Sequence, residues 1–462
     1  MKDDVVQDIM REGRIYEVGG CVRDLLLGRE VASKDYDYLV CRISIDRLQQ
    51  ILRKHGRVDA VGRSFGVIKF TPFTDESESS PTYDISLPRK EISTGVAHRD
   101  FEVDFDPDLP LEADLLRRDF SINAMARDLR DKALIDPYGG QSDLENGIIR
   151  MLAPRSFVED PLRMLRAIQF AARFEFSIEP ITYQALIENV GLIETVAAER
   201  IAEELNKLFT RAARPSVGIR LMHESGMLAH IIPELEETVG CDQPGGYHAY
   251  DVFEHTMRTV DACPPVLRLR WAALFHDITK PRHKRLIDGG ATFYSHEVSG
   301  AQTAAEVLTR LRYGNDFIHD VKTLVDRHMF TTDVGPKGLR RFIRRVGQRL
   351  IPDLLDLRRA DVVAQGMGGT IEDVDRMEKA IEEEISRKPP FGRADLALDG
   401  AELIRIFGLP ESPLIGEILE FLLEKTLDNP DDNTPEILEG SARQYLDNKA
   451  NGININAEDG VG

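Results

Sequence analysis

The sequence predicts an α+β fold, in which a head with a small mixed β-sheet is followed by a long, almost entirely helical region. Short runs with strand periodicity, separated by turn residues, are confined to the first 150 residues. From about residue 151 onward, apolar residues recur at helical spacing instead, as in MLRAIQFAARF. The chain has 462 residues, 42% apolar and 30% charged, so it can form about three packed units and is neither disordered nor collagen-like.

The head begins with a strand, a tight turn and a helix. Residues 15–18 read as a strand, Gly19 and Gly20 form the turn, and the apolar pattern CVRDLLLG reads as a helix closed by Gly28. Three further strands are expected at residues 35–40, 66–70 and 83–88.

Breaks rich in proline and glycine divide the helical region. They occur at residues 214–215, 243–246 and 388–390. We therefore expect four parts, which are a head over residues 1–143, a neck over 144–215, a body over 216–388 and a tail over 389–462.

Composition excludes several classes of protein. No run of 18 apolar residues and no signal peptide is present in the sequence, so we expect a cytoplasmic protein without membrane contact. The cysteines are too few and too scattered for a disulfide framework or a zinc finger; they are Cys21, Cys41, Cys241 and Cys263.

The net charge of −20 should repel nucleic acid unless positive charge is concentrated locally. The window over residues 336–349 is basic and has no acidic residue. It contains the candidate RNA-binding residues Arg340, Arg341, Arg344 and Arg345. The alternative is a solvated helix face without a ligand.

Two carboxylates in the head form a candidate metal site. Asp35 and Asp37 flank Tyr36 on an expected strand, so the period of two places both carboxylates on one face. Carboxylate oxygens suit Mg²⁺, which keeps its other positions for water and phosphates. The turn at Gly19 and Gly20, followed by a helix, is a site for phosphate beside this metal.

The segments EVGGCVRDLLLG and KDYDYLV resemble the opening of the class II tRNA nucleotidyltransferases, which are the CCA-adding enzymes and their bacterial poly(A) polymerase relatives. The resemblance covers residues 14–210 and continues in order through VGRSFGVIKF, LPRKEISTGVAHRDFEVDF, DLLRRDFSINAMA, DPYGGQSDLENGIIRML, EDPLRMLRAIQFAARF and ERIAEELNKL. It implies a nucleotidyltransferase head with Mg²⁺ as cofactor, and tRNA, CTP and ATP as partners.

The resemblance also implies roles for residues of the head. The RNA 3′-hydroxyl attacks the α-phosphate of a triphosphate at two metal ions bridged by Asp35 and Asp37, and pyrophosphate leaves. Asp84 is the expected third carboxylate, with Glu91 as the alternative. The triphosphate is expected at Gly19, Gly20, Arg23, Arg117 and Arg118. Asp119 and Asn123, four apart on one expected helix face, should contact the ribose.

The segment EDPLRMLRA is expected to select the base. Asp160 would accept a hydrogen bond from the exocyclic amine of cytosine or adenine, and Arg163 would donate to the adjoining ring nitrogen. Uracil and guanine would leave these groups without partners, at a cost of about 1–3 kcal/mol per group. The alternative is that Asp160 caps a helix. Arg166 is also expected at the nucleotide, and Arg200 is expected to brace the helix that carries the base-selecting pair by an ion pair, or to be plain surface charge.

The body resembles the HD phosphohydrolase domain in the segments YHAYDVFEHTMRTV, RWAALFHDITKPR, YSHEVSG, DRHMF and RRADVVAQG. The resemblance implies a divalent metal, of unspecified identity, held by His255, His276, Asp277 and Asp361. His248, His296 and His328 could widen this set. The implied activity is hydrolysis of phosphate esters at RNA ends, and the alternative is a degenerate bundle that docks tRNA.

The predicted function is therefore addition of C, C and A to tRNA 3′ ends without a nucleic-acid template. Residues 91–114 are long and intact, unlike the shortened loop of enzymes that add only CC. The alternatives are a tRNA nucleotidyltransferase that adds only A, a poly(A) polymerase, an HD-type hydrolase with an inactive head, and a protein that binds nucleotide or RNA without catalysis.

Overall fold

The computed structural model describes residues 1–29, 36–61, 67–73, 81–93 and 101–451. Its contacts divide the chain into two compact units, Met1–Glu236 and Glu237–Gly462. The expected head and neck thus fall within the first unit. A small sheet at the beginning and helices afterwards confirm the predicted α+β class.

A seven-stranded mixed sheet forms the centre of the head, in the order β3-β4-β5-β2-β1-β8-β9. Neighbouring strands are antiparallel except for the parallel pair β2 and β5. The strands are β1 (Arg14–Val18), β2 (Asp37–Cys41), β3 (Gly56–Val61), β4 (Val67–Pro72), β5 (Tyr83–Ser86), β8 (Ala126–Asp128) and β9 (Leu134–Ile135). The four predicted strands are β1, β2, β4 and β5. The prediction omitted β3, β8 and β9, whose short or polar sequences show little alternation.

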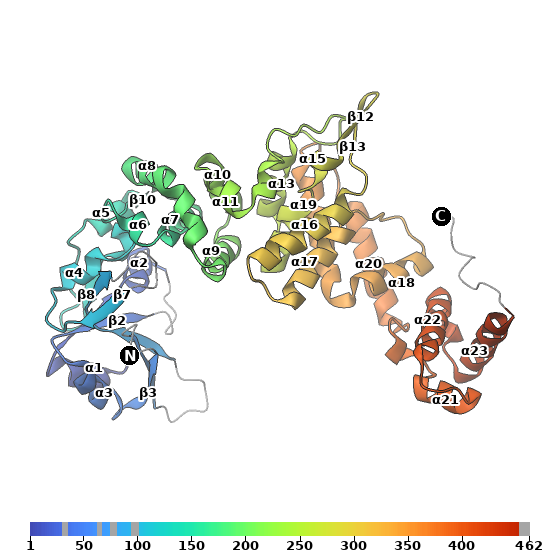
Figure 1. Cartoon of the computed structure of the whole chain (residues 1–462), viewed down its shortest axis with the longest axis horizontal. Helices are drawn as coiled ribbons and strands as arrows, with labels where there is room; N and C mark the ends of the chain where they lie inside the picture. Colours follow the sequence, from blue (N-terminus) through green and yellow to red (C-terminus); the bar gives the residue numbers. More distant parts are fainter. Residues whose placement is uncertain (30–35, 62–66, 74–80, 94–100, 452–462) are drawn as a thin grey trace. The chain divides into compact units, whose positions relative to one another are not determined.

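The two faces of the sheet differ in how much of them is covered. One face carries Tyr38, Ile68 and Ile85 and packs against α1 (Asp3–Met10) and α3 (Ile45–Leu52) in a single apolar cluster (Figure 1). On the opposite face, α4 (Leu111–Leu116) covers residues of β1 and β2 such as Val18 and Leu39. The side chains of β4 and β5 on this second face are exposed or half-buried. Polar chemistry can therefore be exposed there.

Further short elements connect the sheet to the helices that follow it. Among them, β6 and β7 pair as an antiparallel hairpin outside the main sheet, and β10 and β11 pair in parallel. These elements are α2 (Gly20–Leu26), β6 (Arg89–Ser93), β7 (Phe101–Phe105), η2 (Ser121–Asn123), α5 (Gly140–Glu145), β10 (Ile148–Ile149), α6 (Ser156–Glu159) and β11 (Ser177–Ile178).

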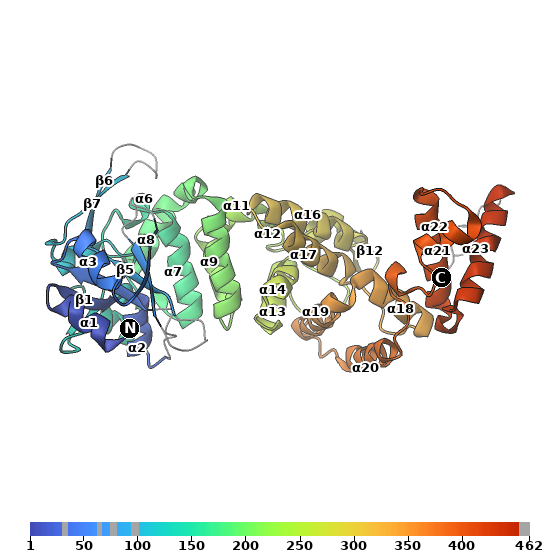
Figure 2. The same cartoon turned by 90° about the horizontal axis from the view of Figure 1, so that it is seen from below.

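The helical part of the first unit is built around α7 (Leu162–Phe174). Pro161 precedes this helix, its apolar residues are buried, and it ends at Glu175 in the left-handed conformation. It packs beside α9 (Ala198–Arg211), as Figure 2 shows. The remaining elements are α8 (Pro180–Asn189), η3 (Val190–Thr195), α10 (Pro215–Glu224), α11 (Met227–Ile231) and α12 (Pro233–Glu236).

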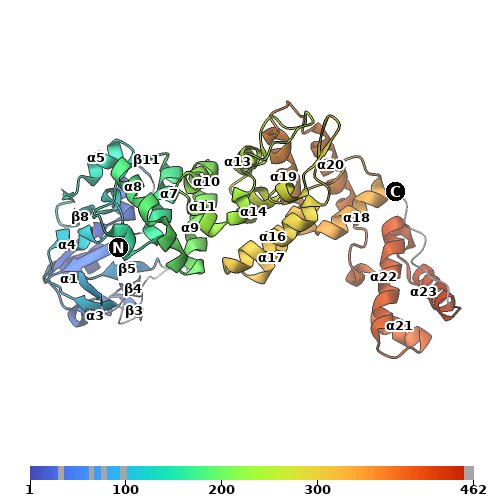
Figure 3. The same cartoon turned by 45° about the horizontal axis from the view of Figure 1, so that its top comes forward.

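The second unit is helical apart from the hairpin of β12 (Arg285–Ile287) and β13 (Gly290–Thr292). Its first helices form a bundle; they are α13 (Val252–Ala262), α14 (Leu267–Phe275), α15 (Lys280–His283), α16 (His296–Arg310), α17 (Asn315–Arg327), α18 (Pro336–Val346), η4 (Gln348–Leu350), α19 (Ile351–Ala364) and α20 (Glu372–Ser386). The last elements share a separate apolar core and lie together in Figure 3; they are η5 (Arg393–Asp395), α21 (Gly400–Phe407), α22 (Pro413–Asp428), η6 (Pro430–Asp432) and α23 (Pro435–Ala450). None of the helices in the described part of the chain is long and apolar enough to cross a membrane.

Gly19 is fixed by both its backbone and its surroundings. It precedes α2 at φ 75° and ψ −132°, a conformation open almost only to glycine. A Cβ atom there would lie 2.5 Å from Nη1 of Arg118, whereas a Cβ atom at Gly28, where φ is 65°, would have no neighbour within 4 Å. We expect Gly19→Ala to lower the free energy of unfolding by about 2–3 kcal/mol and Gly28→Ala by about 1 kcal/mol. Urea unfolding followed by far-UV circular dichroism measures both; equal losses would contradict this account.

Candidate functional site

The pairing of β2 with β5 brings two predicted carboxylates together. Asp37 and Asp84 are register partners on these parallel strands. Both lie on the sheet face opposite Tyr38 and Ile85, where Asp37 is exposed and Asp84 half-buried. Asp35 lies outside the described residues. The alternative carboxylate, Glu91, belongs to β6, which pairs with β7 outside this sheet.

The register adds a basic residue that the sequence prediction missed. Lys69 of β4 is the antiparallel partner of Asp84 and is exposed on the same face. Side chains of directly opposed residues have Cβ atoms about 5 Å apart. A row of Lys69, Asp84 and Asp37 therefore crosses three strands. Alternation in GVIKF marks Lys69 as polar, but only the pairing of the strands shows what it faces.

The expected phosphate turn lies beside this row, because β1 leads through Gly19 into α2. Helix N-termini leave backbone N–H groups free for anions, and Glu17, two residues before Gly19, is the register partner of Tyr38, which follows Asp37. Arg118 packs against Gly19, and Arg117 forms an ion pair with Asp114 at 3.0 Å. The structure thus places Arg118 beside the turn, and the predicted phosphate contacts of both arginines stay predictions.

Arg23 occupies a different position from the one predicted. Its residue is only 4% exposed, so its guanidinium group is not at the surface of the turn. Nη1 donates to Oδ1 of Asn123 at 2.6 Å, and Nε donates to Asp24 at 2.8 Å. Burial lowers the pKa of Arg23 although Asp24 opposes this effect. In this structure Arg23 orients Asn123 and does not present a free phosphate site.

Asp119 and Asn123 do meet, but not on one face of an α-helix as the spacing suggested. Asp119 precedes the short 3₁₀ turn η2, which ends at Asn123, and the amide of Asn123 donates to Oδ1 of Asp119 at 2.8 Å. The other oxygen of Asp119 accepts from Arg166 at 2.7 Å. Arg166 in turn donates to Glu204 of α9 at 3.0 Å.

This network joins the head to the helices that follow it. Burial raises the pKa of the Asp119 carboxyl, but the charge of Arg166 and the amide of Asn123 outweigh this effect and lower it below its usual value. Asp119 and Arg166 were predicted to contact nucleotide. The structure instead has their charged groups bound to each other, so both act here as positioning residues; Glu204 was not predicted.

The predicted base-selecting pair lies where α6 gives way to α7. Asp160 accepts from Arg200 at 3.0 Å, which confirms the predicted brace. It also accepts from the backbone N–H of Leu162 at 3.3 Å, so the capping alternative holds as well. Arg163 donates to Oγ of Ser156 at 2.9 Å and to the carbonyl of Arg117 at 2.6 Å. Both side chains are half-buried.

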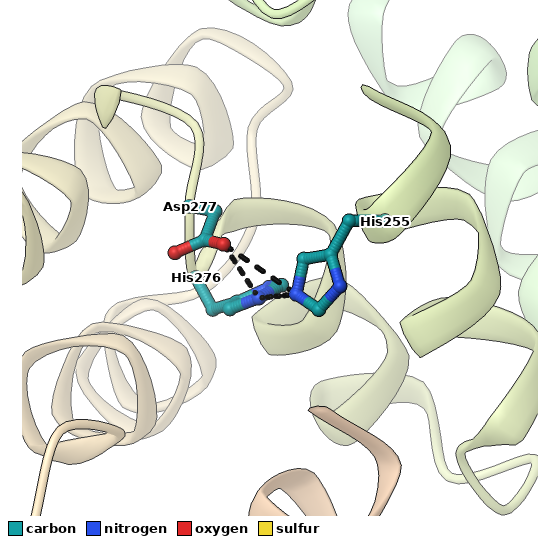
Figure 4. Close-up of side chains that lie close together, drawn as sticks. All are labelled: His255, His276 and Asp277. Atoms are coloured by element: carbon teal, nitrogen blue, oxygen red, sulfur yellow. Dashed lines mark hydrogen bonds and ion pairs between the residues drawn. The ribbon is translucent and has the colours of Figure 1, made fainter. Parts of the chain in front are cut away.

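A second candidate site, which is a metal centre, lies in the second unit. Nε2 of His255 lies 3.2 Å from Nε2 of His276, and 3.5 Å and 3.1 Å from the carboxylates of Asp277 and Asp361. The first three of these residues converge in Figure 4. All four predicted ligands are buried.

The same carboxylate serves a second group of ligands. Oδ1 of Asp277 lies 3.2 Å from Nε2 of His296 and 3.8 Å from Nε2 of His328, whereas Oδ2 faces His276 at 3.2 Å. Two groups therefore have metal-ligand geometry, with Asp277 in both: His255, His276 and Asp277, and Asp277, His296 and His328. His248 lies against the ring of His255, with ring centres 4.7 Å apart.

Hydrogen bonds fix which nitrogen of each histidine faces the centre. The Nδ1 atoms of His276, His296 and His328 lie 2.6–2.8 Å from backbone carbonyl oxygens, so each Nδ1–H donates outward. Burial would lower the pKa of His276, but Asp277 raises it above its usual value, so its Nε2 can donate to Asp277. In a neutral ring, Nε2 keeps its lone pair toward Asp277. Two such atoms cannot hydrogen-bond to each other, yet Nε2 of His296 and His328 are 3.3 Å apart. A cation between them satisfies both lone pairs.

The charges of the metal centre also suit a cation. Burial and the neighbouring His276 lower the pKa of His328 to about 3, so this imidazole is neutral near pH 7. Burial would raise the pKa of Asp277, but His276 and Lys280 hold it well below its usual range. Lys280 was not predicted. Its ammonium lies 2.7 Å from Asp277 and donates to Gln243, and its place one helical turn after Asp277 was the available signal.

The basic window forms α18, but its arginines bind within the protein. Arg340 is buried, pairs with Glu384 at 2.7 Å and donates to the carbonyl of Asp428. Arg341 pairs with Glu424 and Asp428 of α22, and Arg344 with Glu420 and Glu424. These contacts contradict the prediction that RNA binds Arg340, because its guanidinium group is inaccessible, and they leave Arg345 as the exposed member.

Comparisons with known proteins match the domains in which the two candidate sites lie. Three family models match in order: the poly A polymerase head domain over residues 15–150, the probable RNA and SrmB-binding site of polymerase A over 175–238, and the HD domain over 245–366. An A-adding tRNA nucleotidyltransferase of Deinococcus radiodurans is 33% identical over 428 residues, which cover 88% of this chain and 90% of that protein. The chain belongs to the tRNA nucleotidyltransferase family.

Other members of the tRNA nucleotidyltransferase family are similar as well. A multifunctional CCA protein of Azoarcus sp. (strain BH72) is 38% identical over 322 residues, covering 68% of this chain and 73% of that protein. A solved structure of the Bacillus stearothermophilus CCA-adding enzyme in complex with CTP matches with a TM-score of 0.68 at 22% identity, over 98% of this chain and 100% of that one. This last likeness supports the fold.

The network at Asp119 gives a stability prediction for this tRNA nucleotidyltransferase. Asp119→Asn leaves the half-buried Arg166 with one of its two carboxylates, so we expect the first unit to lose about 2 kcal/mol of unfolding free energy. Glu175→Gln, which breaks an exposed pair with Arg214, should cost about 0.5 kcal/mol or less.

Urea unfolding followed by far-UV circular dichroism measures both substitutions. Trp271, the one tryptophan of the chain, lies in the second unit, so its fluorescence transition should stay where it is. A shift of the tryptophan transition by Asp119→Asn, or equal losses for the two variants, would contradict a local role.

Proposed function

We propose that this protein adds C, C and A to the 3′ ends of tRNA from CTP and ATP, with release of pyrophosphate. The observation that carries the proposal is the register of Asp37 with Asp84, beside the turn at Gly19 and Gly20. It offers carboxylates for metal and backbone N–H groups for phosphate on one edge of the sheet. The multifunctional CCA relatives support this choice of product.

Magnesium fits the oxygen ligands of this edge. Asp37 and Asp84, together with Asp35, would hold it. When bound, it activates the RNA 3′-hydroxyl and stabilises the charge that develops on the phosphates. The exposed Lys69 beside Asp84 supplies a further positive charge for the triphosphate.

The base is selected in our proposal by Asp160 and Arg163. Arg200 holds the carboxylate of Asp160 in place, and the carbonyl of Arg117 holds Arg163 against the head. A cytosine or an adenine completes the hydrogen bonds of both groups, whereas uracil and guanine present the opposite pattern.

The free thiols, among them the buried Cys21 and Cys263, support a reducing cytoplasm as the compartment.

The first test compares Asp84→Asn with Asp46→Asn, which alters an exposed aspartate on α3. We expect Asp84→Asn to lower the rate of nucleotide incorporation at least about 100-fold, because the loss of one metal ligand removes several kcal/mol of transition-state stabilisation. Asp46→Asn should keep the rate, and both variants should keep tRNA binding. Incorporation is measured with labelled triphosphates on tRNAs that end before C74, before A76 or after A76.

The same assay separates the alternative products. Incorporation of two C and one A supports the proposal, whereas A alone on primers that already end in CC would favour an A-adding enzyme like the relative from Deinococcus radiodurans. Long A tails would favour a poly(A) polymerase. Undiminished incorporation by Asp84→Asn would overturn the assignment of this carboxylate.

The metal centre favours a second activity, which is hydrolysis of phosphate esters at RNA ends. In our proposal the two groups of ligands, which share Asp277, would each hold a divalent cation. Such cations would bind the attacking water and the leaving oxygen. The carrying observation is the convergence of Nε2 atoms on Asp277 from His276, His296 and His328, whose Nδ1 atoms face backbone carbonyls.

His255→Ala tests this activity against His319→Ala, which alters an exposed histidine on α17. We expect His255→Ala to reduce bound Ni²⁺ or Mn²⁺ at least about tenfold in equilibrium dialysis, because one ligand of the first group is lost. In His255→Ala, hydrolysis of 2′,3′-cyclic phosphates should fall together with metal binding, while nucleotide incorporation should not change. In His319→Ala, metal binding, hydrolysis and incorporation should all stay at the wild-type level. Unaltered metal binding by His255→Ala would contradict the assignment.

A further inference from the structure

Three arginines gather around one aromatic ring in the first unit, and a fourth acts on one of them. The guanidinium carbons of Arg23, Arg29 and Arg173 lie 4.7 Å, 4.8 Å and 4.8 Å from the centre of the Phe174 ring. The fourth, Arg211, repels Arg173 electrostatically, as Arg23 and Arg29 do. We refer to Arg23, Arg29, Arg173 and Arg211 as the arginine cluster.

The arginine cluster carries more positive charge than its surroundings neutralise. Among the described residues, Asp24 is the carboxylate that acts on Arg173, at 3.9 Å, and it is also bound to Arg23 at 2.8 Å. Asp119 and Arg166 also act on Arg23, with opposite signs. Glu175, the next residue along the chain, is paired with Arg214.

The negative ends of helix dipoles do not neutralise the excess positive charge of the arginine cluster. Arg173 and Arg211 lie in the last turns of α7 and α9, and Arg29 follows the end of α2. A helix C-terminus is worth roughly half a negative charge. Within the described residues, four guanidinium groups against Asp24 and three such ends leave more than one positive charge, since Asp119 is offset by Arg166.

Two members of the cluster are largely buried, which makes their unneutralised positive charge costly, and the other two are exposed to solvent. The side chain of Arg173 is 15% exposed and that of Arg23 is 5% exposed. Burial, together with Arg23, lowers the pKa of Arg173 to about 10. Arg29 and Arg211 are exposed, so they form a rim through which an anion can enter. An anion held among these groups would relieve their repulsion.

We propose that the arginine cluster binds a backbone phosphate of the tRNA primer. This inference rests on the proposed function. The triphosphate is assigned to the first turn of α2, and Arg29 lies past the other end of that helix, whose 7 residues span about 10 Å at 1.5 Å per residue. A primer whose 3′-hydroxyl reaches the α-phosphate has its own phosphates at such distances, and the guanidinium fork suits them.

The test measures tRNA binding by fluorescence anisotropy and KM values for tRNA and CTP, using the full chain. We expect Arg29→Gln and Arg173→Gln each to raise the Kd for tRNA about tenfold, since a charged hydrogen bond is lost. The slope of log K against log salt should become shallower by about 0.7–1 per lost contact. KM for CTP should not change. Arg53→Gln, an exposed arginine that ends α3, is the matched control.

Arg173→Lys protects the test against misfolding, because it keeps the charge and should retain most of the tRNA affinity. An unchanged Kd and salt slope in Arg29→Gln and Arg173→Gln, with only the unfolding free energy altered, would overturn the proposal and assign the cluster to helix ends. A rise in KM for CTP instead of tRNA would overturn it as well. The binding measurement does not depend on turnover. If the wild-type protein incorporated no nucleotide, the proposed function would be refuted, whereas the tRNA Kd of the arginine variants would still decide this inference.

Discussion

The ion pair between the half-buried Arg166 and the buried Asp119 is the contact on which the geometry of the proposed nucleotide site depends. Arg166 belongs to α7 and Asp119 to the head, so their charges tie the base-selecting region to the turn that is assigned to phosphate. Through Asn123, the same network reaches Arg23 of α2. A charge removed from water must be paired, so these groups hold one another in one arrangement. Removing these groups from water costs free energy, but the resulting network fixes the positions of the side chains, which a mobile ion pair would not do.

The metal centre also contains buried charged and polar groups that need partners, but its protein groups do not pair as completely as those of the head. In the head, the buried charges have protein partners. At Asp277, the Nε2 atoms of several imidazoles converge, and the ammonium of Lys280 lies beside the carboxylate. Such a set has the composition of a candidate metal site. This difference distinguishes a positioning network from a ligand site.

The net charge of −20 makes the placement of positive charge decisive for an RNA partner. Local sequence suggested α18, whose arginines carry no acidic neighbour in the window. The fold covers that helix with the carboxylates of α20 and α22, which neutralise it. The arginine cluster is the reverse case, since its members are scattered between residues 23 and 211 and meet only around Phe174. Excess charge in a folded protein thus depends on packing between elements more than on composition.

The sequence by itself determined the fold class, the strands β1, β2, β4 and β5, the turn at Gly19 and the residues that converge in the candidate metal centre. These features arise from short-range periodicity, from residues with special backbone freedom and from motifs whose spacing along the chain reflects their chemistry. Only the tertiary structure decided that Lys69 faces Asp84, that Arg23 is buried on Asn123, that Asp119 is occupied by Arg166 and that Arg340 is covered by Glu384. Each of these depends on strand register or on the partner of a long charged side chain, and both are set by residues distant in sequence. The periodicity of one segment predicts which of its faces is polar, but it does not predict which residues of other segments contact that face.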